Sequence, residues 1–294
     1  MANRQQYYND YRKMYKRLTN MFRPRIERAL RAEVNAFAKA YEAAPYLTTV
    51  SVSAPNIENA IRKLHITAGI NNANRTRRYL VKETKSAATE RNDIFAYVIN
   101  EYIKANGLQN LVIQISDTLK KAITAVIEKG EAEGWGVARI VRELNDSTFP
   151  KWMAQRIVRT ELNIASNTGA MVAATEIGVE VQKEWISALD NRTRRIPRDQ
   201  TDHLNMDGKL SDYNEAFLVD GKKGDELMQY PGDPKASANN LCNCRCTVAF
   251  VPQRNADGSL KKMNTNNNPF VPLLENARNN MAVTSFIVNQ MVQR

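Results

Sequence analysis

The sequence predicts an α+β protein in which a mostly helical N-terminal region precedes a small, loop-rich module with a short antiparallel sheet. Up to Gly178, apolar residues recur at steps of three and four, as on one face of a helix. Beyond Gly178, alternation at steps of two begins, and turns rich in glycine, asparagine and aspartate separate the apolar runs. The 294 residues, 43% hydrophobic and 25% charged, fit a folded chain of one large domain or two ordinary ones.

The net charge, the hydropathy and the cysteines indicate which partners to expect and which classes of protein to exclude. Lysine and arginine number 42 against 31 acidic residues, a net charge of +11, which favours an anionic partner such as nucleic acid but equally fits solvated surface charge. No apolar stretch approaches the ~18–20 residues of a membrane-spanning helix, so we expect no membrane partner. The N-terminus lacks the apolar core of a signal peptide, and three clustered cysteines do not form a secreted disulfide framework.

The first segment, residues 5–42, predicts a long basic amphipathic helix. Its apolar stripe consists of Tyr7, Tyr11, Met14, Tyr15, Leu18, Phe22, Ile26, Leu30, Val34, Phe37 and Tyr41. Pro24 should kink this helix or divide it in two. Because about 38 helical residues span roughly 57 Å, we expect part of the stripe to be exposed and to dock onto other chains. The basic residues between the apolar ones are either solvated or face phosphates, and the set that we expect to bind DNA or a partner is Arg12, Lys13, Lys16, Arg17, Arg25, Arg28 and Arg31.

Shorter elements follow in chain order. The expected helices cover residues 55–69, 94–106, 111–130, 137–144 and 150–178, and the expected strands cover residues 179–186 and 244–252. A polar linker at residues 264–268 leads into a tail helix. We therefore divide the chain into a helical region 1–149, with the arm 5–42 and a bundle 55–145, an α+β module 150–254, and a linker with tail helix 255–294.

Residues 156–252 contain short motifs in a fixed order. These are Arg156-Ile157-Val158-Arg159-Thr160-Glu161, Asn167 with Gly169, Gly178, Trp185, Asp190-Asn191-Arg192-Thr193-Arg194, His203, Asp207-Gly208, Phe217, Pro231-Gly232-Asp233 and Asn243-Cys244-Arg245-Cys246. The order resembles the Mu F-like domain of the minor head proteins of tailed phages, also called phage head morphogenesis proteins. Two features depart from the family pattern: residues 195–202 lengthen the segment before His203, and Cys242 precedes the usual Cys-x-Cys.

The motif residues also support an interpretation that does not depend on the family. Arginine recognises carboxylates with two parallel hydrogen bonds, so the helix with Glu161 and the loop with Asp190 predict an ion network that joins helix to sheet. The alternative is an anion pocket built from the same groups. The residues to which we assign a structural role are Arg156, Arg159, Thr160, Glu161, Trp185, Asp190, Arg192, Arg194, Asp207, Gly208, Asn243 and Arg245.

The cysteines offer a candidate metal site. Cys242, Cys244 and Cys246 follow one another at a spacing of two, so in a strand their side chains would leave the same face. With His203 they would form a Cys3His set suited to tetrahedral zinc; the alternative is a structural cysteine pair under the Pro231 loop. We expect no other cofactor. The remaining histidine, His65, is expected only to pack against a helix.

The resemblance implies a function in the phage particle. It implies a structural minor head protein, associated with the portal vertex, that acts in head assembly, genome packaging or genome delivery. Its expected partners are the portal protein, other capsid-interior proteins and, without sequence preference, packaged double-stranded DNA. We expect it in the virion, inside the capsid near the portal vertex, after synthesis in the host cytoplasm.

The competing hypothesis is an enzyme. The chain has no Walker-type loop, no Gly-x-Ser-x-Gly and no His-Glu-x-x-His, so we expect no catalytic residues and no enzymatic activity. The alternative is a zinc-containing, nucleic-acid-processing or toxin-like domain that uses His203 with Cys242, Cys244 and Cys246.

Overall fold

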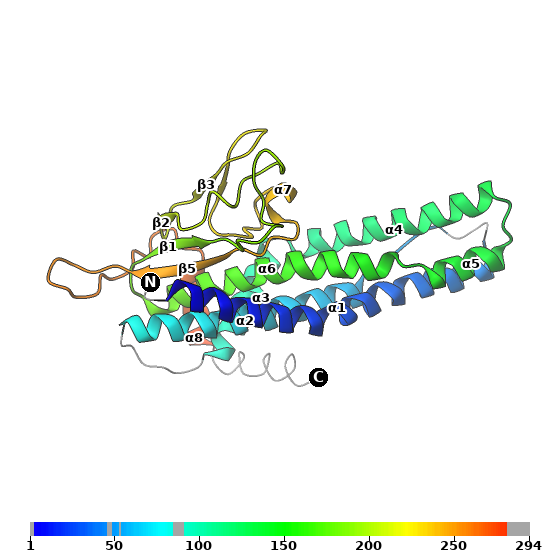
Figure 1. The fold of residues 1–294 in the computed structure, drawn as a ribbon. Coiled ribbons are helices and arrows are strands. Elements are labelled where there is room, and N and C mark those ends of the chain that lie inside the picture. The colour runs from blue at the N-terminus through cyan, green and yellow to red at the C-terminus, as the bar shows by residue number, and fades with distance from the viewer. Residues whose placement is uncertain (1–2, 46–48, 53, 85–90, 281–294) are drawn as a thin grey trace. The chain divides into compact units, whose positions relative to one another are not determined.

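The computed structural model describes residues 3–45, 49–52, 54–84 and 91–280 (Figure 1). The elements are α1 (Arg4–Ala43), α2 (Pro55–Thr84), α3 (Asn92–Ala105), α4 (Leu108–Ala132), α5 (Val137–Asp146), α6 (Phe149–Ile177), β1 (Val181–Ile186), β2 (Leu210–Asp212), β3 (Phe217–Val219), β4 (Glu226–Met228), α7 (Ala238–Leu241), β5 (Thr247–Pro252) and α8 (Phe270–Asn279). Helices thus precede a small antiparallel sheet, which confirms the α+β class. None of the described helices is long and apolar enough to cross a membrane.

The chain forms two compact units. Unit 1 contains residues 1–19, 63–106 and 159–294, and unit 2 contains residues 20–62 and 107–158. Each unit therefore combines segments that are distant in the sequence, and α1, α2 and α6 contribute residues to both. The division into regions 1–149, 150–254 and 255–294 stays a prediction about domains. Unit 1 combines residues 1–19 and 63–106 with most of the expected α+β module.

The strands of unit 1 form a three-stranded sheet and a separate hairpin. The sheet has the order β2–β1–β5, and its antiparallel register pairs Trp185 with Val248. The hairpin pairs β3 with β4. Trp185, Phe217, Met228 and Cys246 belong to one buried cluster that connects the sheet with the hairpin. β1 and β5 were expected, whereas β2, β3 and β4 were not, because three residues are too few to display an alternating pattern.

Two glycines in unit 1 allow close packing of helices. A Cβ on Gly169 of α6 would overlap the backbone oxygen of Gly69 in α2, and a Cβ on Gly69 would lie 2.5 Å from Ile99 of α3. The sequence predicted that a helix ends at Gly69, but in the structure the helix continues past this residue. The expected helix 55–69 continues to Thr84, because packing on both sides of Gly69 compensates its low helix propensity.

Unit 2 is helical throughout its described residues, apart from the loops. In the α4–α5 hairpin, a Cβ on Gly130 would lie 2.6 Å from Ile140, so this glycine allows close approach within α4 rather than ending it. The Arg139 guanidinium lies 4.2 Å from the centre of the Trp135 ring. Arg31 of α1 donates to the backbone oxygens of Asn145 and Ser147 at the end of α5.

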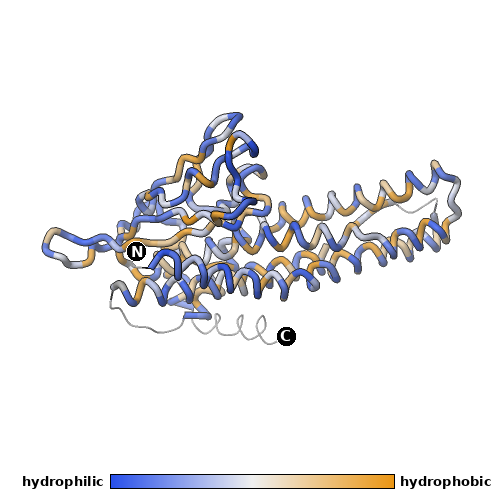
Figure 2. The backbone as a smooth tube through the Cα atoms, in the orientation of Figure 1, coloured by the Kyte–Doolittle hydropathy of each residue, from blue (hydrophilic) through white to orange (hydrophobic). Residues whose placement is uncertain are grey.

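Helix α1 is continuous and its apolar stripe is buried. Pro24 lies inside the helix and does not divide it. Every residue of the stripe is at least nine-tenths buried, for example Phe22 at 1% and Tyr41 at 6% exposure. The expectation of an exposed docking stripe was therefore wrong, because other residues of the same chain cover it along its whole length. Polar and apolar residues alternate along the helices, as Figure 2 shows.

The C-terminal helix is partly described. α8 begins after the polar linker and packs against α3 in unit 1, where the ring centres of Phe270 and Tyr102 are 4.9 Å apart. This agrees with the expected helix after residues 264–268. The continuation of the tail, residues 281–294, lies outside the described residues.

Candidate functional site

His203, Cys244 and Cys246 meet in the buried core of unit 1. Their side chains are 1–2% exposed, and their potential ligand atoms all lie within 4.8 Å of one another. The Nδ1 atom of His203 is 3.6 Å from Sγ of Cys244 and 3.7 Å from Sγ of Cys246. The Trp185 ring contacts the imidazole edge to face, with ring centres 5.3 Å apart. Three of the four residues of the expected zinc set are thus brought together.

Cys242 does not join this group among the described residues. The expectation placed all three cysteines in one strand, but β5 begins only at Thr247. Cys242 instead ends the short helix α7, and Asn243 follows with a left-handed φ of 58°. This turn breaks the alternation, so Cys242 leaves the common face.

A chain of hydrogen bonds fixes the orientation of the imidazole. Nε2 of His203 lies 2.8 Å from Oδ1 of Asn240, and Nδ2 of Asn240 donates to the Glu226 carboxylate. Ser237 also donates to Glu226 through its backbone N–H and its hydroxyl. Burial opposes ionisation of Glu226, but the hydrogen bonds from Ser237 and Asn240 outweigh it and lower its pKa. No sequence pattern indicated Asn240 or Glu226.

The two buried thiols differ in acidity. The hydrogen bond from Cys246 lowers the pKa of Cys244 to about 7, against the opposing effect of burial and with help from Arg194. The same hydrogen bond, together with burial, raises the pKa of Cys246 well above its usual range. Cys244 is therefore the thiol that is ready to ionise first.

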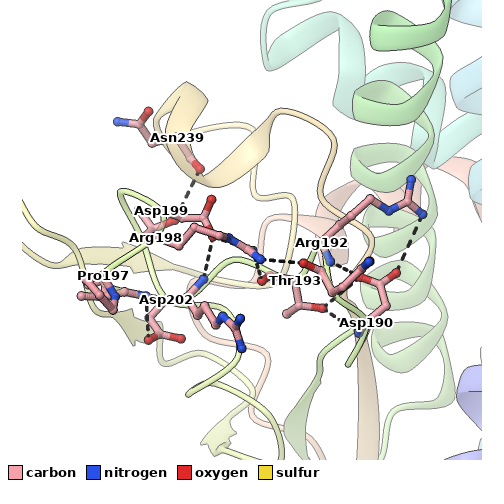
Figure 3. A network of polar contacts seen from close by, with 12 residues as sticks. Asp190, Arg192, Thr193, Pro197, Arg198, Asp199, Asp202 and Asn239 are labelled. Carbon is pink, nitrogen blue, oxygen red and sulfur yellow. Dashed lines mark hydrogen bonds and ion pairs between the residues drawn. The ribbon is translucent and has the colours of Figure 1, made fainter.

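The loop after β1 is held by its own aspartates and arginines (Figure 3). Asp190 accepts from the backbone N–H of Arg192 and pairs with the Arg245 guanidinium at 2.8 Å. Arg198 donates to the backbone oxygens of Asn191 and Thr193, both at 2.6 Å. These contacts hold together the loop that carries the Asp-x-Arg-Thr-Arg motif.

The motif residues Thr160, Glu161 and Arg194 contact α2 and the segment before β5, and the ion network between helix and sheet stays a prediction. Glu161 of α6 lies against His65 of α2, with 3.0 Å between Oε2 and Nε2, so His65 has a partner that the sequence did not indicate. Both side chains are buried. Thr160 of the same motif accepts from the backbone N–H of Asn243, and the Arg194 guanidinium donates to the backbone oxygen of Cys242. Of the motif arginines, Arg192 reaches Asp190 at 3.9 Å, and Arg156 and Arg159 lie on α6.

Neutral amides provide the link from α6 to β5. Asn163 donates to the backbone oxygen of Cys246 at 2.8 Å, and Asn167 donates to the same oxygen at 3.1 Å. Thr247 in turn donates to Asn167 at 2.8 Å. The two asparagines are four residues apart and so share one helix face, a signal that sequence analysis could have used. The arginines of this helix were considered in the sequence analysis and its asparagines were not, because charged residues form the more conspicuous pattern.

Two further charged residues hold the sheet. Arg4 forms ion pairs with Glu184 at 2.6 Å and with Asp207, whose carboxylate also accepts from the backbone N–H of Ser187. Gly208 follows with a left-handed φ of 81°, which explains the Asp-Gly pair.

Lys183 is fully buried, and burial lowers its pKa to about 8. Its position two residues before Trp185 puts it on the same, buried face of β1.

The basic residues expected to bind DNA or a partner lie on α1. In unit 1, Arg12, Lys13, Lys16 and Arg17 are exposed. In unit 2, Arg25 and Arg28 are exposed, whereas Arg31 is half-buried and pairs with Glu27. These side chains are therefore available to solvent, with the exception of Arg31.

Comparison with known proteins identifies relatives of part of the chain. Residues 117–249 match the sequence model of the family described as Phage Mu protein F like protein. A stretch of 182 residues is 28% identical to NAD(+)–arginine ADP-ribosyltransferase EFV of Enterococcus faecalis and covers 58% of this chain and 35% of that protein. A stretch of 147 residues is 27% identical to minor head protein GP7 of Bacillus phage SPP1 and covers 49% of this chain and 43% of that protein. The chain thus spans less than half the length of either relative. No solved structure matches it significantly.

Proposed function

Because residues 117–249 match the Phage Mu protein F like family, we propose that the chain is a minor head protein of a phage, located in the virion near the portal vertex. The observation that carries the proposal is the family match, which contains His203, Cys244 and the Asp190 loop. The similarity to a minor head protein of a Bacillus phage supports it. The motif residues support a structural role, since Glu161, Asp190 and Asn167 all bind other parts of unit 1.

The exposed basic face of α1 supports a role beside packaged DNA. Arg12, Lys13 and Lys16 point to solvent, and their charge is not offset by acidic residues nearby in the sequence apart from Asp10. Such a face binds phosphates by releasing counterions and needs no sequence preference. We assign the portal-facing contact to a surface other than the apolar stripe of α1, which is buried.

The proposal is tested in particles. We expect the chain to be present in purified proheads and mature virions and to co-purify with the portal protein when the two are co-expressed. A matched control is a co-expression with the major capsid protein alone, which should not retain the chain under the same wash. Absence of the chain from both kinds of particle would overturn the proposal.

The similarity to an ADP-ribosyltransferase suggests a second candidate function. That match covers only 35% of the transferase, so the name of that protein does not assign its activity to this chain. We propose that the present chain is not an enzyme. Incubation of the purified chain with NAD and an arginine substrate should give no transfer of ADP-ribose, and incubation with DNA and divalent metal should give no cleavage. Product formation in either assay, abolished in a His203→Ala variant, would favour the enzyme.

A further inference from the structure

We propose that His203 Nδ1, Cys244 Sγ and Cys246 Sγ bind a zinc ion in the core of unit 1. With Zn–S bonds of about 2.3 Å and a Zn–N bond of about 2.0 Å, a tetrahedral ion holds sulfur and nitrogen about 3.5 Å apart. The two observed separations from Nδ1 are 3.6 and 3.7 Å. Both nitrogen–sulfur separations therefore match the distance between two ligand atoms of a tetrahedral zinc ion.

The hydrogen bonds around His203 select the tautomer that binds a metal through Nδ1. Asn240 directs its Nδ2 toward the Glu226 carboxylate, which accepts only, so the amide oxygen must face the imidazole. Nε2 of His203 then carries the proton and donates to Asn240. The lone pair of a neutral imidazole consequently lies on Nδ1 and faces both sulfurs. A histidine oriented by a hydrogen bond from its other nitrogen is the usual arrangement at zinc sites.

Nδ1 of His203 faces two sulfur atoms. The single lone pair of Nδ1 can accept one strong hydrogen bond, yet two sulfurs lie at nearly equal distances from it. A metal ion among the three atoms satisfies all of them at once. Thiolate and imidazole are the ligands that zinc takes in structural sites, and carboxylate-preferring ions such as magnesium do not suit them.

The charge balance of the site also fits a divalent cation. Two thiolates and one zinc ion are neutral together, which removes the cost of burying a lone thiolate in a pocket that is 1–2% exposed. Cys242 lies outside the group because of the turn at Asn243, so the described residues supply three protein ligands, His203, Cys244 and Cys246. The ion would connect the loop before β2 to the segment before β5, and it would act by stabilising unit 1.

The test is the metal content of the full-length chain purified under reducing conditions. We expect about one zinc per chain, a ratio that falls towards zero in Cys244→Ser and Cys246→Ser. The matched control is Cys242→Ser, which changes the neighbouring cysteine outside the group and should keep the zinc. Asn240→Ala should retain the site but weaken zinc affinity about 10–100-fold, because it removes the orienting partner of His203.

A second measurement does not depend on variants that fold. Replacement of zinc by cobalt in the unaltered chain should give the visible bands of a tetrahedral ion and the near-ultraviolet charge-transfer band of cobalt–thiolate bonds. The proposal is overturned if the reduced chain stays free of metal after incubation with zinc or cobalt. It is equally overturned if Cys242→Ser loses as much metal as Cys244→Ser, or if Cys244 and Cys246 are joined as a disulfide in the chain isolated without oxidant.

Discussion

The backbone N–H of His203 donates to the backbone oxygen of Arg194 across 3.0 Å, although residues 195–202 separate the two in the sequence. Leu204 donates to the same oxygen at 2.9 Å. The intervening residues therefore form a closed loop whose two ends meet. His203 is returned to the end of the Asp-x-Arg-Thr-Arg motif, so the longer spacing does not displace it from the core.

A closed loop of this kind should be replaceable. We expect that exchanging residues 195–202 for about four glycine and serine residues lowers the free energy of unfolding by about 1–3 kcal/mol. Closing the shorter loop costs little, but the exchange removes buried Thr201 and the backbone hydrogen bonds that join Gln200 and Asp202 to Lys222 and Asp220. It also removes the hydrogen bonds from Arg198 to Asn191 and Thr193, which lie near the surface. Urea unfolding followed by circular dichroism measures the change. A variant that no longer unfolds cooperatively would show that the loop is itself required.

The pair Glu161–His65 gives a prediction about stability. Glu161→Ala leaves the buried imidazole without its acceptor and should lower the free energy of unfolding by about 1.5–3 kcal/mol, whereas Glu161→Gln retains an oxygen and should cost less. Glu128, which is exposed on α4, provides the control, and Glu128→Ala should change stability very little. Equal effects of the three substitutions in thermal unfolding would contradict a role for this pair.

The close approach of Gly169 to Gly69 gives a second prediction about stability. Gly169→Ala would place a methyl group well inside van der Waals distance of a backbone oxygen, which cannot yield without moving a helix. We expect the free energy of unfolding to fall by about 1–3 kcal/mol, the usual cost of adding a methyl group to a core that is already tightly packed. Gly136→Ala is the matched control, since its Cβ would meet nothing within 4 Å and its φ is –72°. If both variants unfold at the same denaturant concentration, the two helices do not pack as closely as described.

The sequence predicted the helices better than their ends. The apolar stripe of α1 and the period of α4 are strong signals, because helix faces repeat over many residues. Gly69 and Gly130 were interpreted as helix ends, since glycine is a poor helix former, but both serve close packing that only the partner helix explains. The short strands β2, β3 and β4 were beyond prediction, because their pairing depends on partners that are distant in the sequence.

For the candidate site, the sequence predicted which residues could bind a metal but not which residues form hydrogen bonds with them. His203, Cys244 and Cys246 were identified together by composition and order. Cys242 was wrongly included in the group, because the sequence analysis assumed a strand through all three cysteines. The left-handed turn at Asn243 interrupts the extended backbone between Cys242 and Cys244. Asn240 and Glu226 carried no signal, because an amide and an acid on a loop have many uses until the fold places them beside a histidine.

The buried Lys183 predicts a dependence of stability on pH. Its pKa is lowered to about 8 in the folded state from an ordinary 10.5, so between these values the unfolded chain binds a proton that the folded chain does not. Stability should therefore rise with pH across this window, by up to about 3 kcal/mol, and the penalty of the buried charge is fully present below pH 8.

Comparison with Lys183→Met isolates this effect. Cysteine and tyrosine side chains also titrate at high pH, but they are common to both proteins, so their contributions cancel in the difference. Urea unfolding at pH values from about 7 to 10 should show the free energy of unfolding of the unaltered chain increasing relative to that of the variant. A constant difference over this range would contradict a lowered lysine pKa.

The exposed basic face of α1 predicts salt-dependent DNA binding. Replacement of Lys13 and Lys16 by glutamate should weaken binding to double-stranded DNA of any sequence, and the dependence of log K on log salt should become shallower by about 0.9 for each phosphate that the variant no longer neutralises. The matched control replaces Lys261 and Lys262, which are also exposed and alter the net charge equally. Binding titrations at several salt concentrations separate the two variants. If both pairs of substitutions reduce affinity and slope to the same extent, the attraction comes from the overall charge of +11 and not from α1.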